Sequence, residues 1–267
     1  MGLTPPLTDD DLPLQCLLRW EREFANRVYL TQPIGGGVSR DFTWAQTLDE
    51  ARRMAAHLRS FGWPAGSCVA ILSKNCAHWL IADFAIWIAG YVSVPIYPTL
   101  AAASIRQIVE HSQARAIFIG KLDGWDAMAP GVPDDIVRIR FALAPQTGDP
   151  AWDATIAGVA PLRDVPLRGA DELATIIYMS GTTGMPTGVM HSFANIAATA
   201  KTMGEVFKFG ADERVLSYLP LAHVAERIGV EANSLYHGFR VYFAVSLDTF
   251  AADLQRARPT VFFSVPR

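Results

Sequence analysis

The chain has 267 residues, 51% of them hydrophobic and 18% charged, so it carries enough apolar material for a globular core and is not a disordered protein. Its formal net charge of -3 and the lack of any Lys/Arg cluster argue against a general nucleic-acid binder, because neutralising phosphates needs a basic face. The cysteines Cys16, Cys68 and Cys76 are scattered, which gives neither a disulfide framework nor a CxxC metal spacing and favours a reducing, cytoplasmic location.

For residues 1–142 the sequence pattern predicts strands and helices in alternation. Thr43 and Gln46 have the spacing of a capping box, and a helix with one apolar face is predicted to follow them. The elements predicted next are a strand at 68–72, a helix at 77–89, a strand at 92–96, a helix at 102–112 and a strand at 115–119. This order is typical of a mainly parallel sheet with helices on its faces.

The apolar run from Trp79 to Pro98 has only Asp83 as a charge, and it could be taken for a transmembrane span. Gly90 and Pro95 interrupt the run, and a central aspartate would cost about 3 kcal/mol in a bilayer. We therefore predict a buried helix followed by a core strand.

Between residues 143 and 170 the periodic pattern fades into Pro, Gly, Asp and Thr. This predicts a first α/β lobe at 1–142, an irregular linker at 143–170 and a second α/β lobe at 171–267. The elements predicted for the second lobe are strands at 174–179, 214–219, 240–244 and 260–264 and helices at 193–206, 224–237 and 249–257. The predicted fold class is α/β with mainly parallel sheets.

A loop rich in glycine and hydroxyl groups follows the apolar run 174–177. Its glycines leave backbone N–H groups uncovered and permit positive φ, and its Ser and Thr side chains add donors, so it could surround a polyphosphate. By composition alone the same loop could be a mobile surface loop. It is not a Walker loop, because the Gly-Lys-Ser/Thr ending is absent and a short apolar run follows Gly188 before a helix expected near Ser192.

The order of residues in this loop, Ser-Gly-Thr-Thr-Gly-Met-Pro-Thr-Gly-Val over 180–189, resembles the signature loop of the adenylate-forming (AMP-binding) enzymes. That family includes acyl-CoA synthetases, luciferases and peptide-synthetase adenylation domains. The resemblance implies that ATP is bound by Ser180, Gly181, Thr182, Thr183, Gly184, Thr187 and Gly188. Thr187 stands where the family usually has lysine, which removes a cationic contact to the phosphates but leaves the backbone donors.

A second segment, Ser-Tyr-Leu-Pro-Leu-Ala-His-Val-Ala-Glu-Arg over 217–227, resembles a motif of long-chain fatty acyl-CoA synthetases. In these relatives the residue matching His223 lies beside the carboxylate that becomes adenylated, which implies a catalytic and substrate-binding role for His223. Taken alone, a histidine after an apolar run could equally be a packed or surface residue. Glu226 has two readings, a surface charge favoured by the dipole of a helix start or a residue that supports the acyl- or pyrophosphate-binding site.

The resemblance covers most of residues 15–267 and implies activation of a medium- or long-chain fatty acid to acyl-adenylate and then acyl-CoA. The implied cofactors and partners are ATP, Mg²⁺, a fatty acid and coenzyme A, with a cytoplasmic location and peripheral contact at the inner membrane surface as a further expectation. The relatives' main Mg²⁺ ligand and catalytic lysine come after the stretch that this chain matches, so we predict no metal ligand here and expect an N-terminal portion of an enzyme. The alternative is a nucleotide-binding remnant without turnover.

Overall fold

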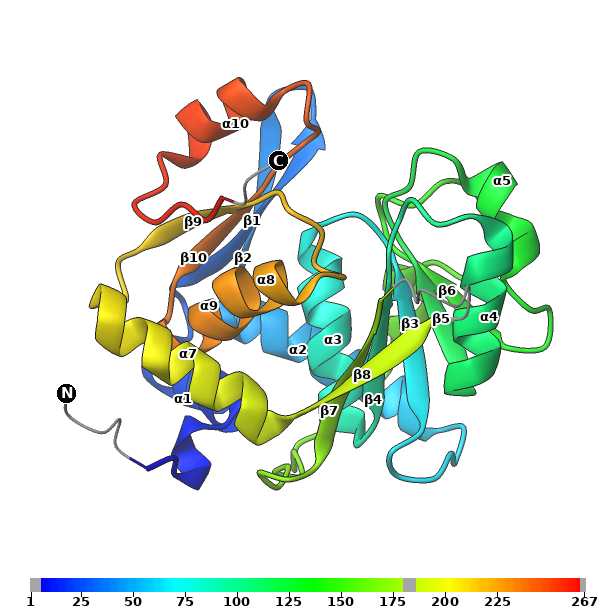
Figure 1. Ribbon diagram of the computed structural model, residues 1–267, viewed down its shortest axis with the longest axis horizontal. Helices are drawn as coiled ribbons and strands as arrows, with labels where there is room; N and C mark the ends of the chain where they lie inside the picture. The colour runs from blue at the N-terminus through cyan, green and yellow to red at the C-terminus, as the bar shows by residue number, and fades with distance from the viewer. Residues whose placement is uncertain (1–5, 180–185, 265–267) are drawn as a thin grey trace.

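The computed structural model describes residues 6–179 and 186–264, which form two twisted sheets with helices between and around them (Figure 1). The predicted α/β class with mainly parallel strands is confirmed. The larger sheet has the order β6-β5-β3-β4-β7-β8 and is parallel except for β8, which pairs antiparallel with β7. Its strands are β3 (Cys68–Leu72), β4 (Val92–Ile96), β5 (Ala116–Ile119), β6 (Val137–Arg140), β7 (Leu173–Met179) and β8 (Thr187–Ser192).

The smaller sheet has the order β2-β1-β10-β9. Strands β1 (Val28–Gly35) and β2 (Val38–Thr43) form an antiparallel hairpin, while β10 (Arg240–Phe243) is parallel to both β1 and β9 (Arg214–Ser217). Each sheet thus contains strands from before residue 143 and strands from after residue 170. The two sheets therefore do not correspond to the two predicted lobes. Whether the two ranges fold as separate units stays a prediction.

The predicted helices begin and end close to their predicted bounds, whereas the helices at 13–24, 125–128 and 152–156 were not predicted. Thr43 and Ser192 are N-cap residues of complete capping boxes with Gln46 and Asn195, at the starts of α2 and α7. The helices are α1 (Pro13–Phe24), α2 (Trp44–Arg59), α3 (Ala77–Ala89), α4 (Ala102–Ser112), α5 (Trp125–Met128), α6 (Trp152–Ile156), α7 (Phe193–Phe207), α8 (Val224–Glu226), α9 (Asn233–His237) and α10 (Phe250–Ala257). A π-helical turn, Arg227–Ala232, joins α8 to α9, so the predicted helix 224–237 is one helical stretch with a widened middle.

One predicted strand does not form, and four strands were not predicted. No strand forms over the described part of 260–264, where Val261 makes only a single bridge to Val215. The apolar run after Gly188 is part of the strand β8, which was not predicted, and neither were β6 and the hairpin 28–43. Strand pairing is decided by partners distant in the chain, which local patterns do not show.

Helix α3 lies between the two sheets and contacts β1 of one and β3 and β4 of the other (Figure 1). All of its 13 residues are buried, which confirms the buried helix predicted for this apolar run. The described helices include none with the length and apolar character that crossing a membrane requires.

A buried charge cluster joins α3 to the π-helical turn. The Arg227 guanidinium donates from Nη2 to Asp83 Oδ2 at 2.5 Å and pairs through Nε with Glu231 Oε2 at 3.0 Å, and each of the three side chains is at most 3% exposed. Arg227 also lies over the rings of Trp79 and Trp87, 5.1 and 5.8 Å from their centroids. One cation therefore faces two carboxyls in a site without water access.

Burial raises the pKa of both carboxyls, and the neighbouring Asp83 raises that of Glu231 further, although Arg227 opposes both shifts. Among the described residues, Asp83 Oδ1 and Glu231 Oε1 have no hydrogen-bond partner. We infer that Glu231 keeps its proton at neutral pH while Asp83 balances the charge of Arg227.

This arrangement predicts unequal costs for two substitutions. Glu231→Gln copies a protonated carboxyl and should change the free energy of unfolding by less than about 1 kcal/mol, whereas Arg227→Met leaves buried carboxyls without a cation and should cost about 3–5 kcal/mol. Urea unfolding at pH 7 measures both. Equal losses from the two variants would contradict a protonated Glu231.

Candidate active site

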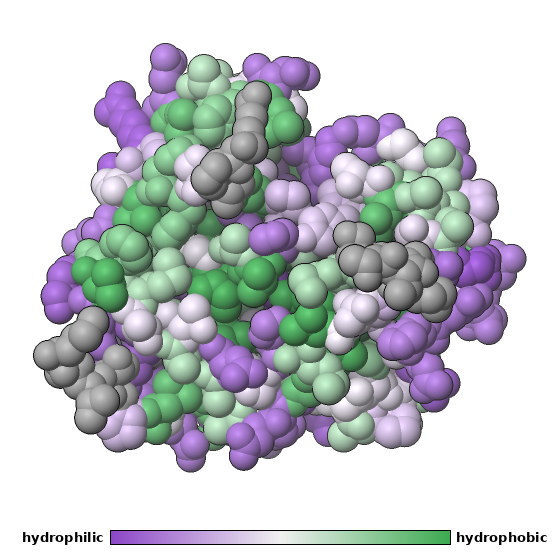
Figure 2. All heavy atoms as spheres, in the orientation of Figure 1, coloured by the Kyte–Doolittle hydropathy of each residue, from purple (hydrophilic) through white to green (hydrophobic). Residues whose placement is uncertain are grey.

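A cavity of about 700 Å³ opens where β4 and β7 end and where the chain leaves β9 for α8. Loops at the carboxyl ends of parallel strands are the usual place for ligands in α/β folds. Met179 and Pro186, which flank residues 180–185, both line the cavity, and so does His223. The other lining residues are Tyr97, Thr99, Leu100, Ser104, Gln107, Ile108, Ile177, Tyr178, Val189, His191 and Val224. On the face seen in Figure 2, apolar side chains gather around α8, β7 and β8.

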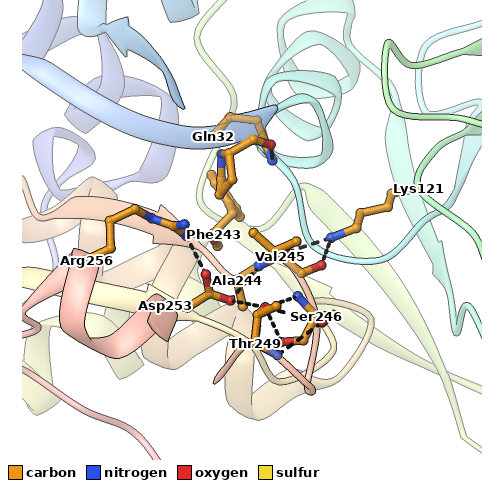
Figure 3. A network of polar contacts seen from close by, with 10 residues as sticks. Gln32, Lys121, Phe243, Ala244, Val245, Ser246, Thr249, Asp253 and Arg256 are labelled. Atoms are coloured by element: carbon orange, nitrogen blue, oxygen red, sulfur yellow. Dashed lines mark hydrogen bonds and ion pairs between the residues drawn. The ribbon is translucent and has the colours of Figure 1, made fainter. Parts of the chain in front are cut away.

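A second cavity, of about 670 Å³, shares Thr99 with the first and lies at the ends of β3, β5, β9 and β10. Lys121 reaches its wall, but its ammonium donates to the carbonyls of Ala244 and Val245 (Figure 3), and burial lowers its pKa. The Asp253 carboxyl holds the same loop by accepting from Val245 N at 2.8 Å and Thr249 Oγ1 at 2.9 Å (Figure 3). Lys121 is therefore held by the loop after β10, and Lys74, the other lysine that lines this cavity, pairs with Asp123.

Most of the predicted phosphate loop lies outside the described residues, namely Ser180, Gly181, Thr182, Thr183 and Gly184. Thr187 and Gly188 lie in β8, opposite Met179 and Tyr178 of β7. A Cβ on Gly188 would come within 2.7 Å of Ile176 Cγ2, so the close approach of β7 requires glycine here. Gly188 has strand conformation and does not use the positive φ that glycine permits.

Side chains on one face of β8 point to the first cavity. Val189 and His191 both line it, and because strand side chains alternate, the exposed Thr187 lies on this same face. Sequence reasoning missed His191, because the alternation becomes visible only once 187–192 is recognised as a strand. Burial lowers the pKa of His191, as does the nearby Arg227 charge, which favours a neutral ring.

His223 is the N-cap residue of α8 and is exposed, so the reading of a packed core histidine is wrong. Its Nδ1 accepts a hydrogen bond from Ala225 N at 3.0 Å, and its ring meets that of Tyr97 edge-on with centroids 6.4 Å apart. Because Nδ1 accepts, a neutral ring carries its proton on Nε2 and offers a donor. The predicted role of His223 stays a prediction.

Glu226 is 1% exposed and lines neither cavity. Its Oε1 accepts from Ser217 Oγ at 2.8 Å and Tyr218 N at 3.0 Å, whereas Oε2 has no partner among the described residues. Burial raises the pKa of Glu226 to about 8, although these hydrogen bonds oppose the shift. The predicted support of the acyl-binding site stays a prediction, and a direct substrate contact would need this side chain to leave its buried place.

One group of potential metal ligands occurs among the described residues, formed by Glu50, His78 and Asp153. It shares no residue with either cavity. Glu50 already pairs with Arg40 at 2.8 Å and accepts from Trp152 Nε1 at 3.1 Å, so its oxygens have partners without an ion. We assign no metal to this group.

The family model for AMP-binding enzymes matches residues 17–267. The chain belongs to the AMP-binding enzyme family. Long chain acyl-CoA synthetase 6, peroxisomal, of Arabidopsis thaliana is 34% identical over 256 residues, covering 86% of this chain and 35% of the relative. Long-chain-fatty-acid–CoA ligase FadD15 of Mycobacterium bovis is 33% identical over 242 residues, covering 86% of this chain and 40% of the relative. The chain thus spans well under half the length of these curated relatives.

Solved structures of the family share the fold. The anthranilate CoA ligase AuaEII in complex with anthranoyl-AMP superposes with a TM-score of 0.84 at 20% identity, covering 97% of this chain and 51% of the other. A benzoate CoA ligase from Burkholderia xenovorans gives a TM-score of 0.81 at 22% identity, covering 96% and 50%. At these identities the likeness concerns the fold of this AMP-binding chain and not its substrate.

The raised pKa of Glu226 predicts a pH-dependent stability. A carboxyl that ionises near pH 8 when folded and near pH 4.5 when unfolded contributes fully below pH 4.5, and its contribution is lost as pH rises towards 8, by at most about 1.4 kcal/mol per pH unit. Glu226→Gln should remove this pH-dependent contribution to the free energy of unfolding. The stability of the variant relative to wild type, measured by urea unfolding, should therefore rise between pH 5 and pH 8. Parallel pH profiles would contradict the buried, protonated state.

Proposed function

We propose that this chain carries the ATP- and acid-binding face of a fatty acyl-CoA synthetase. The observation that carries the proposal is the cavity of about 700 Å³, which brings His223 together with Met179 and Pro186, the residues that flank 180–185 of the predicted phosphate loop. A cavity of this size is within the range that small-molecule substrates occupy. Membership of the AMP-binding family supports a nucleotide as one of its ligands.

The chemistry is the activation of a carboxylate. One carboxylate oxygen attacks the α-phosphorus of ATP, the bond to the bridging oxygen breaks, and pyrophosphate leaves. In the second half-reaction the thiol of coenzyme A attacks the acyl carbon, and AMP leaves. The protein has to hold both reactants in line and stabilise negative charge on the reacting oxygens.

His223 is suited to the second of these tasks. Its Nδ1 is engaged with Ala225 N, so Nε2–H is available to donate to a carboxylate or phosphate oxygen in the cavity. The predicted loop residues 180–184, with Thr187 and Gly188, would supply further donors for the phosphates. When bound, Mg²⁺ would neutralise phosphate charge, and we assign no ligand for it among the described residues.

A fatty acid is the acid that we propose. The cavity combines apolar side chains, among them Leu100, Ile108 and Ile177, with a few polar groups near His223, which suits an acid with an apolar tail. The names of the two curated relatives, a long chain acyl-CoA synthetase and a long-chain-fatty-acid–CoA ligase, support the same class. The proposed setting is cytoplasmic, with peripheral membrane contact as the route to an apolar substrate.

Nucleotide binding without turnover is the second candidate, and Thr187 favours it, because lysine is usual at this position in the family loop. The two candidates differ in whether pyrophosphate is released when the chain is given ATP, Mg²⁺ and a fatty acid. ATP binding without pyrophosphate release would favour the second.

His223→Asn tests the role of the imidazole cleanly. Asparagine is a good N-cap residue and should keep the stability within a few tenths of a kcal/mol, whereas His223→Ala should lose about 1 kcal/mol with the cap. Both variants should lower the rate of pyrophosphate release at least tenfold if Nε2–H acts on the reacting oxygens. A wild-type rate in His223→Asn would refute the assignment.

Thr187→Lys should tighten ATP binding roughly tenfold at low salt, because a charge-assisted contact is worth about 1.5–3 kcal/mol and a neutral hydroxyl about 1. The gain should shrink at high salt. Met190→Lys is the matched control, since residue 190 is exposed and points to the opposite face of β8. ATP titrations at two salt concentrations measure the effect, and equal gains in both variants would show a nonspecific charge effect.

A further inference from the structure

The segment Tyr218–His223 carries His223 from the end of β9 to the start of α8 without regular secondary structure. Its last four residues form a tight turn in which His223 N donates to Pro220 O at 2.9 Å. We call this segment the histidine loop. Side chains from outside it bond to three further backbone groups, Tyr218 N, Leu219 O and Leu221 N.

Asn75 holds the middle of the histidine loop from the other sheet. It follows β3, is 8% exposed, and lies 146 positions before Leu221 in the chain. Its Nδ2 donates to Leu219 O at 2.6 Å, and its Oδ1 accepts from Leu221 N at 3.0 Å. One amide therefore satisfies a carbonyl and an N–H on either side of Pro220, which requires both a donor and an acceptor on one side chain.

Glu226 holds the start of the loop. Its Oε1 accepts from Tyr218 N and from Ser217 Oγ, and Asn75 Nδ2 lies 3.4 Å from the same oxygen. Ser217 Oγ also accepts from Asn75 Nδ2 at 2.8 Å. Asn75, Ser217 and Glu226 thus form one closed, buried network around the exit of β9.

The position of His223 is fixed both by this network and by its role as the N-cap residue of α8. Glu226 stands three residues after His223 in the helix that His223 caps, so anchoring its carboxyl to Ser217 and Tyr218 ties the helix start to the strand end. Asn75 closes the loop between them. Glu226 lines neither cavity and Asn75 lines only the second one, so both act on His223 through the backbone.

We propose that Asn75 and Glu226 are positioning residues, which hold the histidine loop so that the imidazole of His223 faces the cavity with its Nε2–H. The proposal rests on the proposed function for the reaction that it serves. The contacts to the loop stand independently of that function. The role of Glu226 is then that of a hydrogen-bond acceptor, for which ionisation is not required.

The test compares Asn75→Ala, Glu226→Ala and Glu226→Gln with wild type in the full chain. Pyrophosphate release from ATP and a fatty acid gives kcat and KM, and hydrogen–deuterium exchange of the peptide 217–223 reports on the loop. Both alanine variants should exchange this peptide faster and lose roughly tenfold to hundredfold in kcat, with the KM for ATP changed less than about threefold. Glu226→Gln keeps an acceptor oxygen and should restore both readouts to near wild type.

Asn233→Ala is the matched control, because Asn233 is a fully buried asparagine whose Nδ2 donates to Ile228 O at 2.6 Å, away from the histidine loop. It should lower the melting temperature as much as Asn75→Ala while leaving kcat and the exchange of 217–223 unchanged. If Asn75→Ala and Glu226→Ala lost only melting temperature, like the control, the positioning role would be overturned.

The two proposals fail in different ways. If wild type released no pyrophosphate, the proposed function would fail, and the exchange of 217–223 alone would then decide whether these side chains hold the loop. Faster exchange in the alanine variants would support the proposal that these side chains hold the histidine loop, and unchanged exchange would overturn it. Active wild type with unchanged variants would overturn the positioning role and leave the proposed function standing.

Discussion

The guanidinium of Arg227 is buried against α3, so its charge has to be neutralised there, and the Asp83 carboxylate of α3 does this at 2.5 Å. Removing either partner would leave an uncompensated buried charge, which costs several kcal/mol. Because α3 packs on strands of both sheets, the pair ties the helical stretch 224–237 to the centre of the molecule. His223 is the N-cap residue of that stretch, so the position of the candidate active site depends on this charge.

Two sets of contacts near Arg227 fix the position of the candidate active site. Glu226, the preceding residue, binds the exit of β9, and Asn75 links the histidine loop to the larger sheet. The side chains of Glu226 and Asn75 both form hydrogen bonds to backbone atoms. Such bonds are the usual way in which an irregular segment is buried without unsatisfied polar groups. A loop held in this manner can present a side chain in one orientation, which supports the assignment of a positioning role.

Much of the fold follows from local pattern. Helices 77–89 and 102–112 and strands 68–72 and 92–96 were predicted at their observed bounds, because helix periodicity, capping residues and continuous apolar strands are written in neighbouring residues. The hairpin 28–43, the strands β6 and β8 and the absence of a strand at 260–264 were not predicted, since each depends on which distant segment is available for pairing. The same limit hid His191, whose place in the cavity follows from the alternation of β8.

The sequence by itself determined the AMP-binding family, the α/β class and the segments that carry His223 and the predicted phosphate loop, because these rest on the order of adjacent residues. Only the tertiary structure decided what surrounds them. It placed Asn75 beside Leu221 across 146 positions and turned the apparent surface charge of Glu226 into a buried acceptor with a pKa near 8. It also placed a cationic side chain beside the carboxylate of Asp83. Such contacts arise from packing between elements far apart in the chain, where desolvation makes each unpaired polar atom costly, and no local pattern records them.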